Sequence, residues 1–344
     1  MKIVGCDFHP SFQQIAILDT TTGEIEQRRL SHSDGEAEQF YRDLGSPALI
    51  GIEAVGNSLW FEQLIAGLGH ELWIGDAAQI RASYVRRQKT DRRDAGHILR
   101  LLVEQRFPRI WVPSSQQRDV RQLLVHRHKL VGMRTRVKTE LQHLALNQGM
   151  QKKRQLWSVR GRADFKNLSL TPWAAQRRED LLAVLSLFES QVEKLDRAVE
   201  ALAAGDRQAQ LLMTQPGVGP ITALAFVVTI GDAGRFKRGK QVASYLGLIP
   251  AERSSGDKRR LGSISKQGNV FLRTMLVEAA QSACRYDEEF RREYWRRCHH
   301  KPKGVAKVAA ARKLAVRLYW MLRNQTPYAP AVHNEGSSSH VVAD

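Results

Sequence analysis

Two aspartates three residues apart, Asp91 and Asp94, stand in a strongly basic segment of the chain. The sequence around them predicts a helix, on which residues three apart share one face with Cβ atoms about 5–6 Å apart. Paired carboxylates can hold a divalent metal beside a phosphodiester while neighbouring arginines bind the nucleic acid. The alternative interpretation is that both acids form surface ion pairs with those arginines.

Two further acids, Asp7 and Glu53, each end an apolar segment that predicts a buried strand. Functional groups of an open α/β sheet gather at strand ends, so we expect these acids near Asp91 and Asp94. Four carboxylates form an oxygen-only site, which suits Mg²⁺ or Mn²⁺ better than zinc. Two such ions, about 3.5–4 Å apart, can activate the attacking oxygen and stabilise the leaving one. The alternative is that Asp7 and Glu53 only cap turns.

The elements that would position these acids follow a recognisable order. The apolar and turn patterns predict strands over residues 3–7, 14–19, 24–30, 48–53 and 71–74, with helices over 36–44 and 59–68 between them. A further helix after the last strand carries Asp91 and Asp94. This is the order of a ribonuclease H-like sheet, so we predict an α/β domain over residues 1–112.

From Ser114 the pattern changes to long helices, and we predict a helical coiled-coil arm and linker over residues 113–204. The clearest signal is a set of apolar residues alternately four and three apart, Leu181, Leu185, Phe188, Val192, Leu195, Val199 and Leu202. The preceding helix has apolar residues every seven positions, interrupted by Arg127 and Arg134, which fits either a partner helix or a solvated face. We expect the two helices to pair antiparallel and to dimerise. Between them lie basic residues interleaved with three aromatics that either stack bases or anchor a loop, Trp157, Phe165 and Trp173.

A third, mainly helical domain is predicted over residues 205–325, followed by a disordered tail over 326–344. A Gly-rich turn from Gln215 to Pro220 precedes an apolar helix, as in the phosphate-binding turns of helix-hairpin-helix modules. A basic loop with several serines and glycines follows Pro250. Its serines either form turns or supply a nucleophilic hydroxyl assisted by the arginines.

Charge and cysteine content narrow the class of protein. The net charge is +18, but residues 1–80 carry −8 and residues 81–344 carry +26, so nucleic acid is the favoured partner of the basic part. No apolar stretch of about 18 residues and no signal peptide is evident, so we expect no membrane association. The three cysteines are far apart and predict neither disulfides nor a zinc site, which favours a cytoplasmic setting.

Several short motifs occur in a fixed order along the chain. They are Asp7 at the end of the first strand, Glu53-Ala54-Val55-Gly56, Thr90-Asp91 with Asp94-Ala95, Pro216-Gly217-Val218-Gly219, Tyr245 to Pro250, Ser255-Gly256, and Ile264-Ser265-Lys266 with Gly268-Asn269. Each motif is weak alone, whereas the ordered set is specific. Over nearly its whole length the chain resembles transposases of the insertion-sequence 110 family, the RNA-guided bridge recombinases. One departure is Val55, where threonine is usual in that family.

The resemblance implies roles for individual residues. Asp7, Glu53, Asp91 and Asp94 would form a RuvC-like metal-binding tetrad for Mg²⁺ or Mn²⁺. Ser255, the serine before glycine in the loop after Pro250, would be the nucleophile of a second catalytic domain. Because Ser254 is adjacent, this assignment can shift by one residue.

The resemblance also implies partners. We expect donor and target DNA as substrates, a structured guide RNA from the non-coding end of the element, and a homodimer or homotetramer. In such an assembly the carboxylates of one protomer meet the serine of another. We therefore expect a transposase or site-specific DNA recombinase in the bacterial cytoplasm, associated with the nucleoid.

Two other interpretations compete with this one. The first is a metal-dependent nuclease of the Holliday-junction type, which forms no covalent intermediate and needs no nucleophilic serine. The second is a nucleic-acid-binding scaffold whose acids are structural. A strand-transfer assay with and without magnesium separates the scaffold from the enzymes.

Overall fold

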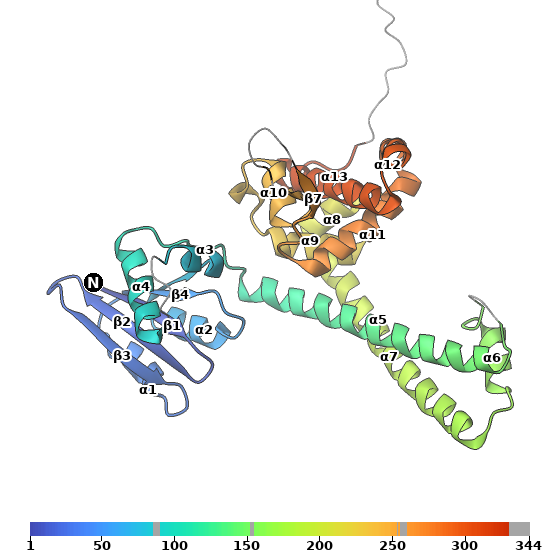
Figure 1. Cartoon of the computed structure of the whole chain (residues 1–344), viewed down its shortest axis with the longest axis horizontal. Coiled ribbons are helices and arrows are strands. Elements are labelled where there is room, and N and C mark those ends of the chain that lie inside the picture. The colour runs from blue at the N-terminus through green and yellow to red at the C-terminus, as the bar shows by residue number, and fades with distance from the viewer. Residues whose placement is uncertain (85–89, 152–154, 253, 255–259, 330–344) are drawn as a thin grey trace, which may run out of the picture. The chain divides into compact units, whose positions relative to one another are not determined.

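The structure is a computed structural model that describes residues 1–84, 90–151, 155–252, 254 and 260–329. The chain divides into two compact units, Met1–Val112 and Pro113–Asp344 (Figure 1). Among the described helices, none combines the length and apolar character that a bilayer-crossing segment requires. The finer sequence-based boundaries at residues 204 and 325 stay predictions.

The first unit is built on a five-stranded sheet of order β3-β2-β1-β4-β5. The strand β1 pairs antiparallel with β2 and parallel with β4, and β5 is parallel to β4. The elements are β1 (Lys2–Phe8), β2 (Phe12–Asp19), β3 (Ile25–Ser31), α1 (Glu36–Arg42), β4 (Ala48–Glu53), α2 (Leu59–Gly67), β5 (Glu71–Gly75), α3 (Ala77–Ala82) and α4 (Asp91–Val103). The predicted α/β sheet is confirmed, and its order fits a ribonuclease H-like domain.

The two faces of this sheet are covered by different helices because side chains alternate along each strand. From β1, Val4, Cys6 and Phe8 enter a buried cluster with Phe61 and Ile65 of α2. The intervening positions of β1 face α4, which packs against β1, β2 and β4 (Figure 1). Asp7 belongs to this second set, so its side chain lies on the α4 face.

Glycines let α4 approach this face closely. A Cβ atom on Gly5 would lie 2.3 Å from the backbone nitrogen of Leu99 and 2.4 Å from the carbonyl oxygen of Ala95. On β4, a Cβ atom on Gly51 would lie 2.7 Å from a methyl carbon of Leu102. The backbone of α4 therefore lies directly on β1, and the first turn of α4 reaches the end of β1 that carries Asp7.

The second unit is mainly helical, as predicted. Its elements are α5 (Ser115–Asn147), α6 (Val159–Lys166), α7 (Pro172–Gly205), α8 (Arg207–Met213), α9 (Pro220–Ile230), η1 (Ala233–Arg235), α10 (Gly239–Tyr245), β6 (Pro250–Glu252), β7 (Leu261–Ile264), α11 (Val270–Tyr286), α12 (Glu288–His300) and α13 (Lys303–Asn324). The helix α9 is buried along nearly its whole length, and the strands β6 and β7 form a small antiparallel pair.

The long helices α5 and α7 pack antiparallel along their sides (Figure 1). Arg127 of α5 pairs with Asp196 of α7, and the ammonium of Lys138 lies 2.9 Å from Glu189. Three buried apolar residues seven positions apart line the seam on α7, Leu185, Val192 and Val199. Arg127, whose side chain is 17% exposed, thus contacts the partner helix and is not part of a solvated face. Dimerisation through these helices stays a prediction.

The segment between α5 and α7 contains the helix α6, which the sequence did not predict. Its aromatic residues have different environments. Phe165 is buried in a cluster with residues of α5 and α7, and Trp157 lies under Lys138 and Arg162, whereas Trp173 is 86% exposed. Phe165 is therefore an anchor of this segment and cannot stack on a base.

Candidate metal centre

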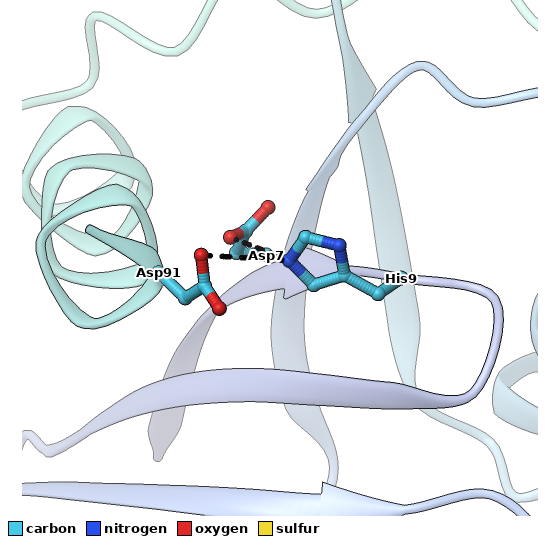
Figure 2. A group of neighbouring side chains, drawn as sticks. All are labelled: Asp7, His9 and Asp91. Atoms are coloured by element: carbon cyan, nitrogen blue, oxygen red, sulfur yellow. Dashed lines mark hydrogen bonds and ion pairs between the residues drawn. The ribbon is translucent and has the colours of Figure 1, made fainter. Parts of the chain in front are cut away.

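Asp7, His9 and Asp91 form the core of the candidate site (Figure 2). Asp7 lies near the end of β1, His9 lies in the turn between β1 and β2, and Asp91 is the first residue of α4. The Nε2 atom of His9 is 3.1 Å from a carboxylate oxygen of Asp7 and 3.8 Å from one of Asp91. One potential ligand atom from each residue lies within 4.8 Å of the other two, so a single cation can contact all three.

Asp94 and Glu53 extend the site around the side chain of Tyr84. The Tyr84 hydroxyl donates a hydrogen bond of 2.6 Å to Asp94, whose residue is 5% exposed. The pKa of that hydroxyl is raised, first by burial, then by the bond and charge of Asp94, and also by the negative charges of Asp7 and Glu53. The four acids singled out in the sequence thus gather at one edge of the sheet. Their role as metal ligands stays a prediction.

The pKa of the Asp7 carboxyl reflects both its burial and its charged neighbours. Burial raises the pKa of the Asp7 carboxyl, the charge and hydrogen bond of His9 oppose this, and the charges of Asp94 and Asp91 raise it again. The net shift is upward. A carboxylate whose charged form is disfavoured in this way gains from a bound cation, which neutralises the cluster.

The local structure of α4 explains why two acids can be placed at its start. The Thr90 side chain caps the helix by accepting from the backbone N–H of Arg93, and Asp91 and Asp94 occupy the first turn. Acids stabilise this end of a helix, so helix capping alone could account for an exposed aspartate such as Asp91. It does not account for Asp94, which is buried on the sheet-facing side and bound to Tyr84.

Glu53 has a cationic neighbour of its own. A guanidinium nitrogen of Arg81, at the end of α3, lies 3.7 Å from a carboxylate oxygen of Glu53. The Arg81 side chain is 78% exposed, so solvent screens this pair strongly. The pair places a solvent-screened positive charge beside Glu53.

Two residues of the site, His9 and Tyr84, were not predicted from the sequence. His9 follows Asp7 by two positions, and strand alternation places residues 7 and 9 on the same side, so this signal was present. Tyr84 gave no comparable signal, because its bond to Asp94 joins residues ten positions apart that no local pattern relates.

Some predicted residues cannot be placed. Ser255 lies outside the described residues, as do three of the basic residues proposed to bind nucleic acid, Arg86, Arg87 and Lys89. Ser254 is described: its hydroxyl donates to a carboxylate oxygen of Glu252 at 2.7 Å and accepts from the backbone N–H of Arg260 at 3.2 Å. The serine loop thus begins beside an acid at the end of β6.

The Gly-rich turn before α9 is closely packed. Gly217 has a φ of +87°, and a Cβ atom there would lie 2.4 Å from the backbone nitrogen of Ala283 in α11. Packing against α11 is therefore sufficient to explain this glycine. Phosphate binding by the turn stays a prediction.

Comparison with known proteins adds two family matches. Residues 4–149 match a transposase profile of the DEDD type named for IS110, and this range contains all four acids of the candidate site. Residues 209–295 match the profile described as "Transposase IS116/IS110/IS902 family", and this range contains the serine loop.

Whole-chain comparisons agree with these profiles. A Pseudomonas aeruginosa protein named "Probable family 20 transposase" is 30% identical over 95% of this chain and 98% of its own length. The transposase for insertion sequence element IS1111A of Coxiella burnetii is 27% identical over 95% of this chain and 91% of its own. The transposase for insertion sequence element IS1328 of Yersinia enterocolitica is 26% identical over 81% of this chain and 84% of its own. The protein therefore belongs to the IS116/IS110/IS902 family of transposases.

Proposed function

We propose that this transposase cuts and rejoins DNA with a serine nucleophile and a divalent metal held by Asp7, Glu53, Asp91 and Asp94. The observation that carries the proposal is the position of Asp7 and Asp91, which lie at one edge of the sheet with a raised Asp7 pKa. An acid cluster of this kind matches the DEDD-type profile over the same residues.

The donor set fits a divalent cation with a preference for oxygen. Carboxylates predominate, and Asp91 and Asp94 lie close enough to Asp7 to raise its pKa, so a bound cation would relieve the repulsion among these acids. When bound, Mg²⁺ or Mn²⁺ neutralises developing negative charge on phosphate oxygens and lowers the pKa of an attacking hydroxyl. The exposed Asp91 lies on the solvent side of the cluster, where a phosphodiester can approach.

Ser255 is the proposed nucleophile, and its hydroxyl oxygen would form a bond to phosphorus while the departing DNA oxygen takes up a proton. A serine hydroxyl is a weak nucleophile unless a base, a metal or cationic neighbours assist it. Ser254 is the second candidate nucleophile. Its hydroxyl donates a hydrogen bond to Glu252, whose carboxylate could accept the hydroxyl proton. Both serines therefore enter the test.

The proposed partners follow from the family and from charge. The +26 on residues 81–344 favours binding of donor and target DNA and of a structured guide RNA. Assembly as a dimer or tetramer would let the serine of one protomer meet the carboxylates of another. The antiparallel α5 and α7 helices are the proposed assembly element.

The test is a strand-cleavage assay on labelled DNA carrying the element ends, with RNA transcribed from the flanking non-coding stretch. A denaturing gel of the full chain should show a covalent protein–DNA adduct that needs added Mg²⁺ or Mn²⁺. Ser255→Ala and Asp7→Asn should each abolish the adduct, and the double variant should be scarcely worse, since the groups act as a unit. Loss in Ser254→Ala alone would move the nucleophile by one residue.

The alternative function is a metal-dependent nuclease of the Holliday-junction type. It is favoured if Ser254→Ala and Ser255→Ala both cleave at the normal rate without an adduct while Asp7→Asn does not cleave. If cleavage survives in Asp7→Asn as well, the carboxylate site is not catalytic and the proposal fails.

A further inference from the structure

We infer that His9 is a nitrogen ligand of the metal proposed to bind Asp7 and Asp91, and that it shifts the preference of this position from Mg²⁺ toward Mn²⁺. This inference rests on the proposed function and adds to it. The four acids alone form an oxygen-only site, whereas the imidazole makes a mixed one (Figure 2).

The interatomic distances fit ligands of one ion. In octahedral coordination with bonds of roughly 2.1 Å, adjacent ligand atoms lie about 3 Å apart and opposite ones about 4 Å. The Nε2 atom of His9 is 3.1 Å from Asp7 and 3.8 Å from Asp91, and all three ligand atoms fall within 4.8 Å of one another. A small contraction of the group is enough to bring one cation into contact with all three.

The turn between β1 and β2 holds His9 in this orientation. The backbone N–H of His9 donates to the carbonyl oxygen of Phe12 at 2.9 Å, and Pro10 restricts the intervening backbone. The His9 ring stacks on the Phe12 ring, with centroids 4.6 Å apart. The Arg29 guanidinium lies 4.0 Å from the centroid of the Phe12 ring. The imidazole is therefore fixed before a metal arrives, which is the usual requirement for a ligand.

The location of His9 also distinguishes it from a structural histidine. His70, in the same unit, accepts at Nδ1 from the backbone N–H of Ala48 and donates from Nε2 to the carbonyl oxygen of Tyr41, and so ties two elements together. The described polar contacts of the His9 side chain are instead with Asp7 and Asp91, two acids on separate elements, and this side chain is 34% exposed. Its ring nitrogen faces the point where the negative charge of the site converges.

The nature of the ligand predicts the metal preference. Mg²⁺ binds oxygen and gives up its water reluctantly, whereas Mn²⁺ accepts imidazole and carboxylate together. A nitrogen ligand at this position therefore adds more to the affinity for Mn²⁺ than to that for Mg²⁺. Removing the imidazole should therefore narrow the difference in affinity between Mn²⁺ and Mg²⁺.

The experiment titrates Mn²⁺ into the metal-stripped full chain, with Mg²⁺ as competitor. Electron paramagnetic resonance of the free ion measures how much Mn²⁺ is bound. Pulsed measurements on the bound Mn²⁺ should show coupling to an imidazole ¹⁴N nucleus. His9→Ala should lose this coupling and lower Mn²⁺ affinity by tenfold or more, while Mg²⁺ affinity changes about twofold or less. His9→Gln, which keeps a polar group in the turn, should also lose the coupling.

The control is His300→Ala, which removes an exposed imidazole at the end of α12 and should change neither affinity nor coupling. If Mn²⁺ binds, Asp7→Asn abolishes binding and no ¹⁴N coupling is seen in the unaltered protein, then His9 is not a ligand while the metal site stands. If Mn²⁺ binding is equal in the unaltered protein and Asp7→Asn, the site itself is wrong and both proposals fail.

Discussion

Two aspartates, the partly buried Asp7 in the first unit and the buried Asp287 in the second, have opposite electrostatic surroundings. Asp7 lies among other acids, and its pKa is raised by burial and by the charges of Asp94 and Asp91 despite the nearby His9. Burial would also raise the pKa of Asp287, but hydrogen bonds from the Phe290 backbone and Tyr328, with the charge of Arg317, lower it overall.

The difference in charged neighbours is the one expected between a structural acid, Asp287, and an acid of the proposed metal site, Asp7. Asp287 caps α12, and its carboxylate lies 2.7 Å from the Arg317 guanidinium, with 2% of its side chain exposed. The fold itself supplies the compensating cation there. The charged neighbours that set the pKa of Asp7 are His9 and the acids Asp91 and Asp94, so a bound cation would relieve the repulsion among the acids. The raised pKa of Asp7 among other acids fits the proposed metal site, whereas the lowered pKa of Asp287 fits a structural ion pair.

The largest expected effect is on activity. Asp7→Asn should lower strand cleavage by about 10³-fold or more, because metal stabilisation of the transition state contributes several kcal/mol. The metal-free fold should keep its free energy of unfolding within about 1 kcal/mol, since the change relieves repulsion. The measurements are single-turnover cleavage and urea unfolding.

Asp19→Asn is the matched control, because Asp19 ends β2 as Asp7 approaches the end of β1. It should leave cleavage unchanged. If Asp7→Asn is largely unfolded but its folded fraction cleaves normally, then Asp7 is a structural acid, as Asp287 is.

The second prediction reverses the first. Asp287→Asn should lower the free energy of unfolding by about 3 kcal/mol, because it leaves the partly buried Arg317 without its main partner. Cleavage per folded molecule should stay normal. Urea denaturation measures the loss, and a change below about 0.5 kcal/mol would show that Glu289, the other partner of Arg317, compensates fully.

The third prediction tests how the site is assembled. Gly5→Ala should destabilise the first unit by about 2 kcal/mol and weaken metal binding, because the added Cβ pushes α4 away from β1. Gly96→Ala is the control on α4 itself: among the described residues its Cβ would meet only Gln27, at 3.6 Å, and the change should stabilise the helix by up to about 1 kcal/mol. Equal effects of the two variants in thermal unfolding would contradict this account of α4 packing.

These glycines also show where sequence reasoning succeeds and where it stops. Strand and helix periodicity is local, so the sheet and α4 could be predicted from apolar patterns and turn residues. The gathering of Asp7 and Asp94 could be expected from strand ends, but the distance between them depends on how closely α4 lies on Gly5. That distance is a tertiary property, and a single glycine in a strand does not reveal its contact.

The site residues that were not predicted also divide into local and tertiary cases. His9 could have been found from its alternation with Asp7, since both belong to one short segment. Tyr84 contacts Asp94, ten positions away along the chain, and Asp287 meets Arg317 thirty positions away through the packing of α12 on α13. Such pairs depend on the assembled core, which no local pattern encodes.

The fourth prediction concerns pH and follows from the lowered pKa of Asp287. A group with a lowered pKa in the folded state stabilises the fold above its unfolded pKa and loses that contribution as pH falls through the folded value. The stability of the second unit should therefore decline below the usual value of 3.8. Asp287→Asn should make the free energy of unfolding fall less steeply with decreasing pH in this range. An unchanged slope would show that other carboxylates cause the decline.

The smallest expected effect comes from Arg81, which is the counterpart of Arg317 in the carboxylate site. Arg81 lies 3.7 Å from Glu53 with 78% of its side chain exposed, whereas the Arg317 side chain is 22% exposed and lies 2.7 Å from Asp287. Arg81→Ala should therefore change the free energy of unfolding by less than about 0.5 kcal/mol, as expected for a screened surface pair. Removing this competing cation should tighten metal binding on the order of twofold. Titration of Mn²⁺ into the stripped protein measures this, and weaker binding in Arg81→Ala would mean that Arg81 positions Glu53 for the metal instead of competing with it.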